Sequence, residues 1–240
     1  MAAVLLIFFG FIVALGVAGA VANSRRKRAL AAMASAKQWQ LTKKDRRLPD
    51  TFGGRPFATG HDRIARIVLN GWHNGHAILV IDYEYKTPAS TSHQVMPGSD
   101  SPYMTPGNNS DDTHNYWAAC VVDLPVPLPA VEVVPRKRHA SHAAGPGILA
   151  GAPEFVRGDP GFDQRYLVTT LNQQLAADIL DPKVLWLIAS WPDFAWRIEG
   201  TRLLTWGKGK VKPVWVETSL NMLVALAEAF PAEVWRTARG

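Results

Sequence analysis

The chain begins with an uncharged apolar stretch, Ala2 to Ala22, which contains no Asp, Glu, Lys, Arg or His. As an α-helix these 21 residues would extend about 31 Å, close to the thickness of a bilayer hydrocarbon core. Four cations follow at once: Arg25, Arg26, Lys27 and Arg28. We therefore expect a transmembrane anchor over residues 1-23, in contact with the lipid bilayer through Ala2 to Ala22. We expect the four cations to act electrostatically at the membrane surface.

The position of these cations predicts the orientation of the anchor. Basic residues favour the cytoplasmic side, so we expect a single-pass protein of the bacterial cell membrane, with its N-terminus outside and its globular domain cytoplasmic. The alternative is export after signal cleavage, because Ala20-Val21-Ala22 before Asn23 fits the pattern of small residues at a cleavage site. The length of the apolar run and the absence of Lys or Arg before it favour a retained anchor.

The positive charge is concentrated near this predicted anchor. Of the 26 Lys and Arg residues, 12 lie between Ser24 and Arg66, together with only three acids. From Ile67 onward 14 basic residues face 17 acidic ones, which argues against a nucleic-acid-binding surface. The single cysteine, Cys120, excludes an intramolecular disulfide, and its apolar neighbours predict a buried packing role.

Composition divides the remaining chain into two parts. Residues 24-62 are predicted to form a basic juxtamembrane helix and a linker. Residues 63-240 are predicted to form one globular domain, with flexible loops near 87-112 and 136-153, where Pro, Gly and small polar residues accumulate.

Two patterns in this domain predict β-hairpins. Apolar and polar residues alternate over Arg66 to Tyr85, around an Asn74-Gly75 turn. A second hairpin is expected from Phe194–Glu199 and Arg202–Trp206, across Gly200-Thr201. Three further strands are expected at Thr113–Leu124, Val131–Val134 and Phe162–Thr170, the second of them short and at an edge.

Helices are expected between and after these strands. One covers Asn172 to Leu180, and the next is capped by Asp181 with Pro182 in its first turn. An amphipathic helix covers Val214 to Phe230. The predicted fold class is α+β: an N-terminal transmembrane helix followed by a mainly antiparallel sheet domain with packed helices, including this C-terminal one.

The sequence contains no catalytic or metal-binding motif. Asp82 and Glu84 share one face of the predicted second strand, and we expect that face to be solvated. Two groups of candidate metal ligands, His73 with His76 and Asp111 with Asp112 and His114, are better explained as ordinary loop residues. We predict no catalytic residue, no metal and no cofactor.

The nine tryptophans suggest one further site. Trp186, Trp196 and Trp206 lie in the C-terminal part and could line a ligand pocket. A core rich in tryptophan, with some rings at an interface, explains them better and is the favoured interpretation.

Several short motifs together resemble a known group. They are Arg25–Arg28, an Ala-rich helix that ends at Trp39, Gly54–Phe57, Asn74-Gly75 before Asp82–Tyr85, Leu124–Pro129 and Trp196–Gly200. This combination is similar to small single-pass membrane proteins of unknown function from high-GC Gram-positive bacteria, an uncharacterised actinobacterial family. The resemblance implies a retained anchor and one cytoplasm-facing domain. It implies no reaction, because the group has none assigned.

These observations favour a non-enzymatic interaction or scaffold domain held at the inner leaflet. Its partner would be an unknown protein or a second copy of the chain, and nucleic acid is not expected. One alternative is a small-ligand-binding protein or enzyme that uses the tryptophan-rich C-terminal half. The other is an exported envelope protein.

Overall fold

The described residues of this computed structural model are 2–88, 112–139 and 147–237, with side chains described from Gly19 onward except at positions 138, 139 and 237. Most of the predicted flexible loop near 87-112 lies outside the described residues. The same holds for residues 140–146 of the predicted loop near 136-153.

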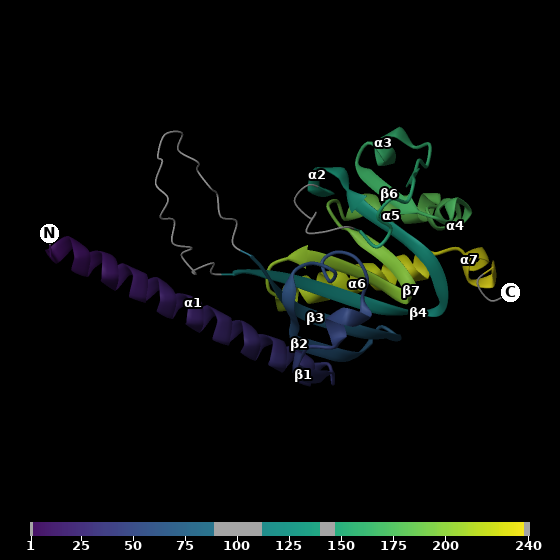
Figure 1. Cartoon of the computed structure of the whole chain (residues 1–240). Helices are drawn as coiled ribbons and strands as arrows, with labels where there is room; N and C mark the ends of the chain where they lie inside the picture. Colours follow the sequence, from purple (N-terminus) through teal and green to yellow (C-terminus); the bar gives the residue numbers. More distant parts are fainter. Residues whose placement is uncertain (1, 89–111, 140–146, 238–240) are drawn as a thin grey trace, which may run out of the picture.

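The domain is built on an antiparallel sheet of seven strands, in the order β1-β2-β3-β4-β6-β5, with β7 paired to β4 (Figure 1). The strands are β1 (Gln40–Asp45), β2 (His61–His73), β3 (His76–Thr87), β4 (Thr113–Pro135), β5 (Glu154–Phe155), β6 (Tyr166–Thr170) and β7 (Trp196–Lys208).

Helices cover one face of this sheet, and a short 3-10 turn, η1 (Leu48–Thr51), lies near the other. The α-helices are α1 (Ala2–Ala36), α2 (Arg136–His139), α3 (Pro160–Asp163), α4 (Gln173–Ile179), α5 (Pro182–Ser190), α6 (Pro213–Ala229) and α7 (Ala232–Thr237). The predicted α+β class is confirmed. The predicted cap is also present, since Asp181 Oδ1 accepts a hydrogen bond of 2.8 Å from Val184 N.

The prediction of a transmembrane anchor over residues 1-23 is wrong. Within the described part of the chain, no helix is long and apolar enough to cross a membrane. The described side chains of α1 begin at Gly19 and include Arg25 to Arg28, and the helix then packs on the domain through Leu30 and Ala34, which are 0% and 2% exposed. The predicted single-pass localisation, with the N-terminus outside and the domain cytoplasmic, depended on this anchor and is therefore also wrong. Most of Ala2 to Ala22 lies outside the described side chains.

The first predicted hairpin is present as β2 and β3. Asn74 and Gly75 have φ angles of 48° and 81°, which a tight turn between right-twisted strands requires. His73 and His76 close the ladder on either side of the turn.

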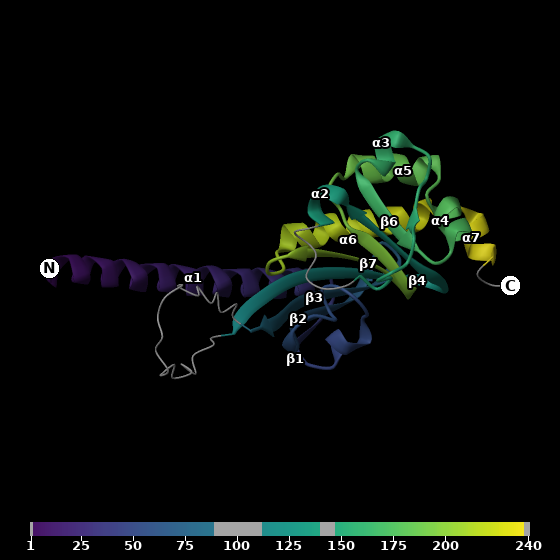
Figure 2. The ribbon, with the colours of Figure 1, turned by 45° about the horizontal axis from the view of Figure 1, so that its top comes forward.

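β4 corrects the prediction of two separate strands, because it is one strand of 23 residues. Its first part pairs with β3 and β7, and its last part pairs with β7 and β6 (Figures 1 and 2). The prolines Pro125, Pro127 and Pro129 lie in the curved stretch between Asp123 and Val131, where β4 pairs with β7 only at Leu128. A proline has no backbone N–H to donate, so these three prolines interrupt the hydrogen bonds between β4 and β7 only at this bend.

The second predicted hairpin is also wrong. β7 runs straight through Gly200-Thr201 and pairs with β4 on both sides of it. Gly200 has a φ of +61° and pairs with Leu128, inside the stretch where β4 has more residues than β7 between paired positions. The irregularity is therefore a bulge of β4, and β7 makes no turn at this glycine. Trp196, Ile198 and Leu203 consequently lie on one face of the sheet. Leu204 lies on the opposite face.

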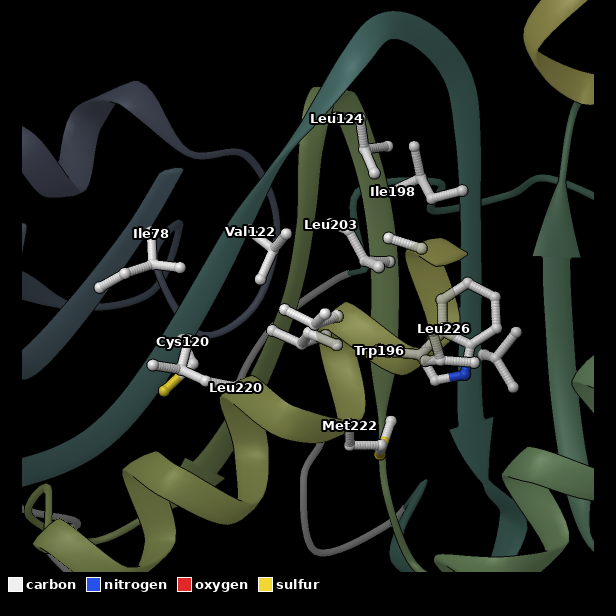
Figure 3. Packing of buried hydrophobic residues seen from close by; sticks show 14 of the residues in the cluster. Ile78, Cys120, Val122, Leu124, Trp196, Ile198, Leu203, Leu220, Met222 and Leu226 are labelled. Carbon is white, nitrogen blue, oxygen red and sulfur yellow. The ribbon is translucent and has the colours of Figure 1, made fainter. Parts of the chain in front are cut away.

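The sheet separates two hydrophobic clusters. The larger packs beneath α6, where Cys120, Val122 and Leu203 meet Leu220 and Leu226 (Figure 3). The smaller lies on the opposite face and is richer in aromatic residues: Phe52, Phe57, Tyr83, Tyr85, Trp117 and Trp206. Cys120 is fully buried, and this burial raises the pKa of its thiol well above the ordinary value.

Candidate functional site: the α1 groove

A half-open groove of about 930 Å³ lies between α1 and the sheet, and we call it the α1 groove. α1 forms one wall, while β1, β2 and β3 form the floor together with His114 and Tyr116 of β4 and Lys210 after β7. Its lining contains seven Lys or Arg residues and two carboxylates. The cations are Arg26, Lys27, Arg28, Lys43, Lys44, Arg66 and Lys210.

Asp82 fastens α1 to the sheet at the base of this groove. Its Oδ2 accepts a hydrogen bond of 3.0 Å from Arg26 Nη1, and its Oδ1 accepts one of 2.9 Å from Val211 N. Arg26 Nη1 also donates to Val211 O at 3.0 Å. Asp82 is only 4% exposed, so this ion pair is shielded from solvent. One of the four predicted surface cations therefore acts inside the fold.

Glu84, two residues further along β3, has a different pair of partners. Arg66 donates to both of its oxygens, at 2.7 and 2.9 Å, and His114 Nδ1 lies 2.8 Å from Oε1. Burial of the carboxyl acts to raise its pKa, but the hydrogen bonds from Arg66 and His114 outweigh burial and hold the pKa of Glu84 below its ordinary value. The same hydrogen bond raises the pKa of Arg66.

The expected solvated face of β3 is therefore corrected. Asp82 and Glu84 do share a face, but it is the helix-covered one, which also carries Ile78 and Val80. Where α6 no longer covers this face, α1 and the segment around Val211 do. Both carboxylates are engaged in ion pairs, which gives them positioning roles.

The predicted site residues do not form one site. Lys27 and Arg28 line the α1 groove with Arg26, whereas Arg25 is exposed and is not part of the lining. The three tryptophans are separated: Trp196 is buried under α6, Trp206 is buried on the opposite face and Trp186 is 71% exposed on α5. No shared pocket joins them among the described residues.

The candidate metal ligands are also dispersed. His73 Nε2 lies 2.7 Å from Asn221 Oδ1, and His76 Nε2 lies 3.7 Å from Glu228 Oε1, so each faces α6. Asp112 lies near Lys86, His114 contacts Glu84, and Asp111 is outside the described residues. Over the described ranges, no group of three His, Cys, Asp or Glu side chains could hold a metal ion.

A second charged site, the Arg197 cluster, was missed from the sequence. It consists of Arg55, Glu132, Arg197 and Glu199 on the face opposite α6. Arg197 is fully buried, donates to the carbonyl oxygens of Gly53 and Arg55, and reaches Glu199 Oε2 at 3.0 Å. Arg55 pairs with Glu132 at 3.1 Å. Burial lowers the pKa of the Arg197 guanidinium, which still stays charged at neutral pH.

One signal for this cluster is present in the sequence. Arg197 and Glu199 alternate with Trp196 and Ile198, so a strand places both charges on one face. The register then sets Glu132 directly opposite Arg197. Two cations and two carboxylates therefore balance in a closed site that attaches the 52–57 segment to the sheet.

Comparison with known proteins finds one informative likeness. No family model and no curated protein matches this chain. The fold is similar to the crystal structure of the mycobacterial trehalose monomycolate transport factor A, TtfA, with a TM-score of 0.57 and 12% sequence identity. The match covers 84% of this chain and 92% of that chain, so nearly the whole TtfA structure has a counterpart here. At this identity the likeness establishes a shared fold.

Proposed function

We propose that this protein is a non-enzymatic accessory factor that acts by binding during the transport of an envelope glycolipid. The observation that carries the proposal is the fold shared with TtfA over 92% of that chain. The cargo would be trehalose monomycolate or a glycolipid of the same class. The partner would be a protein of the transport machinery, or a second copy of this chain.

The geometry of the described residues supports binding more than catalysis. The lone thiol, Cys120, is inaccessible, and the carboxylates of the α1 groove are fully committed to Arg26, Arg66 and His114. A general acid or base needs a free proton site next to substrate. The α1 groove instead offers an open surface with excess positive charge, which suits recognition.

Deletion of the gene tests the proposal. We expect total synthesis of the glycolipid to persist while its arrival at the cell surface falls, as followed with labelled trehalose, and the wild-type gene should restore arrival. Unchanged surface glycolipid in the deletion strain would contradict a transport role. Loss of total synthesis would indicate an enzyme instead.

Cross-linking in intact cells followed by mass spectrometry tests the partner. We expect cross-links from the domain to a protein that moves the glycolipid, or to a second copy of the chain. Cross-links only to enzymes of glycolipid synthesis would contradict the assignment.

A further inference from the structure

The α1 groove holds more positive charge than its own carboxylates neutralise. Arg26 and Arg66 are paired, and Lys210 lies 4.2 Å from the centre of the Tyr116 ring. The other four cations, Lys27, Arg28, Lys43 and Lys44, have no acidic partner among the described residues. They come from two separate elements, α1 and β1, and line the same concavity. The mutual repulsion of these four cations is unfavourable in the free protein. An anion that binds between them would turn this repulsion into attraction.

The backbone of β1 places two of these cations, Lys43 and Lys44, in the groove. Lys43 pairs with Ile67 and Asp45 pairs with Ala65, so Lys44 and Arg66 both fall between these two paired positions. Like charges directly opposite each other on neighbouring strands destabilise a sheet. Lys44 also has a φ of +60°, a left-handed conformation that a lysine rarely adopts. Both Lys43 and Lys44 consequently line the groove, although they are adjacent on a strand.

The groove is not charged throughout. Its lining also includes apolar side chains from the wall and the floor: Ala31 and Ala34 of α1, with Trp39, Leu41 and Ile67. Trp39 is held in place by its Nε1, which donates to Trp72 O at 2.8 Å. Gly71 makes room for the ring, because a Cβ at this position would lie 2.3 Å from Trp39 Cδ1. The site thus combines a rim of cations with a fixed apolar floor.

We propose that the α1 groove binds an anionic amphiphile, a molecule with a phosphate or carboxylate head group and an alkyl chain. The head group would lie against Arg28, Lys43 and Lys44, and the chain would cover the apolar floor. A volume of about 930 Å³ accommodates such a chain. This inference rests on the groove alone and does not depend on the proposed transport role.

The two buried carboxylates favour this ligand over a polyanion. Asp82 and Glu84 line the base of the groove and would repel an acidic segment that ran along it. A single head group at the rim avoids both carboxylates, while its chain gains free energy from the burial of its apolar surface.

Calorimetric titration of the full-length protein tests the proposal with three probes. They are dodecyl phosphate below its micelle concentration, inorganic phosphate, and dodecyl maltoside as a neutral chain. We expect dodecyl phosphate to bind at least about tenfold more tightly than either other probe, and to weaken as salt rises. Equal binding of dodecyl maltoside would overturn the role of the cations. Equal binding of inorganic phosphate would overturn the role of the floor.

Matched charge reversals locate the site. Arg28→Glu and Lys43→Glu should each weaken dodecyl phosphate binding on the order of tenfold, because each reversal removes a cation from the groove and adds an anion that repels the head group. Arg25→Glu, on the same helix but outside the groove, and Lys183→Glu, on α5, should leave binding within about twofold. All four residues are exposed, so circular dichroism should find each variant folded. Equal losses in the groove and control variants would overturn the assignment.

A fourth probe addresses the alternative occupant. An acidic peptide of alternating Glu and Gly should bind more weakly than dodecyl phosphate. If the peptide binds more tightly, and Arg28→Glu abolishes its binding, the groove is a protein-docking site and the amphiphile assignment is wrong.

Discussion

The Arg197 cluster and the α1 groove use the same residue types in opposite ways. In the Arg197 cluster two arginines face two glutamates, and Arg197 itself has no exposed surface. In the α1 groove seven cations face two carboxylates, and the site is open to solvent. A balanced closed cluster fixes one segment of chain against another, whereas an unbalanced open one retains charge for a ligand. The difference between structural and binding roles thus lies in charge balance and access, not in residue type.

The largest expected effect is on the closed cluster. Arg197→Met leaves Glu199 and Glu132 without the guanidinium next to them, in a buried site. We expect the free energy of unfolding to fall by about 3–5 kcal/mol, the usual cost of removing one partner of a buried ion pair. Urea denaturation measures it, with Lys183→Met as an exposed control. A loss of unfolding free energy below about 1 kcal/mol would contradict this role, because ion pairs on the protein surface contribute that little.

The next effect concerns the attachment of α1. Asp82→Asn removes the charge that Arg26 meets but keeps an oxygen able to accept from Val211 N. We expect a loss of about 1–3 kcal/mol in unfolding free energy. In a double-mutant cycle with Arg26→Met the two losses should be strongly non-additive. Additive losses would mean that the two side chains do not interact in solution.

A smaller effect is expected from pH. Glu84 has a lower pKa in the folded protein than in the unfolded chain, whose ordinary value is 4.5. The unfolded chain therefore takes up the proton first, so the stabilisation from Glu84 is complete above about pH 4.5 and is lost as pH falls through the folded-state pKa. Thermal unfolding from pH 6 to pH 3 should fall more steeply for the wild type than for Glu84→Gln. Parallel curves would contradict this role of Glu84.

The smallest effect on stability should come from the open groove. Lys44→Ala removes a cation that lines the same groove as Arg66 and has no acidic partner among the described residues. We expect the unfolding free energy to change by less than about 0.5 kcal/mol, and to rise if it changes at all. A loss above about 1 kcal/mol would mean that Lys44 is structural and would weaken the contrast between the two sites.

Local patterns predicted part of this fold well. The β2–β3 hairpin follows from Asn74-Gly75, and α5 follows from Asp181 and Pro182, because turn and cap geometry depend on neighbouring residues. The continuity of β4 and β7 could not be predicted in this way. Proline and glycine often mark the end of a strand, but here the extra residues of β4 bulge out between Asp123 and Val131. The two strands therefore stay paired on both sides of this stretch.

The charged sites depended on contacts between distant segments. Asp82 and Glu84 were expected in solvent because Arg26, 56 residues away from Asp82, and Val211, 129 residues away, are not visible as partners in the sequence. Arg25 to Arg28 were expected to act together at a membrane surface, yet Arg26 forms an ion pair with Asp82 and Arg25 does not line the groove. The three tryptophans lie apart in the fold: Trp196 and Trp206 are in the core, as the favoured interpretation expected, and Trp186 is exposed.

One NMR titration tests the contrast between the two sites most directly. Dodecyl phosphate is added to ¹⁵N-labelled full-length protein, and the amide shifts of both sites are followed in the same spectra. Our account predicts saturable shifts at Arg28, Lys43 and Lys44 and none at Gly53 or Arg55 of the Arg197 cluster. Shifts at the Arg197 cluster without shifts in the α1 groove would contradict it.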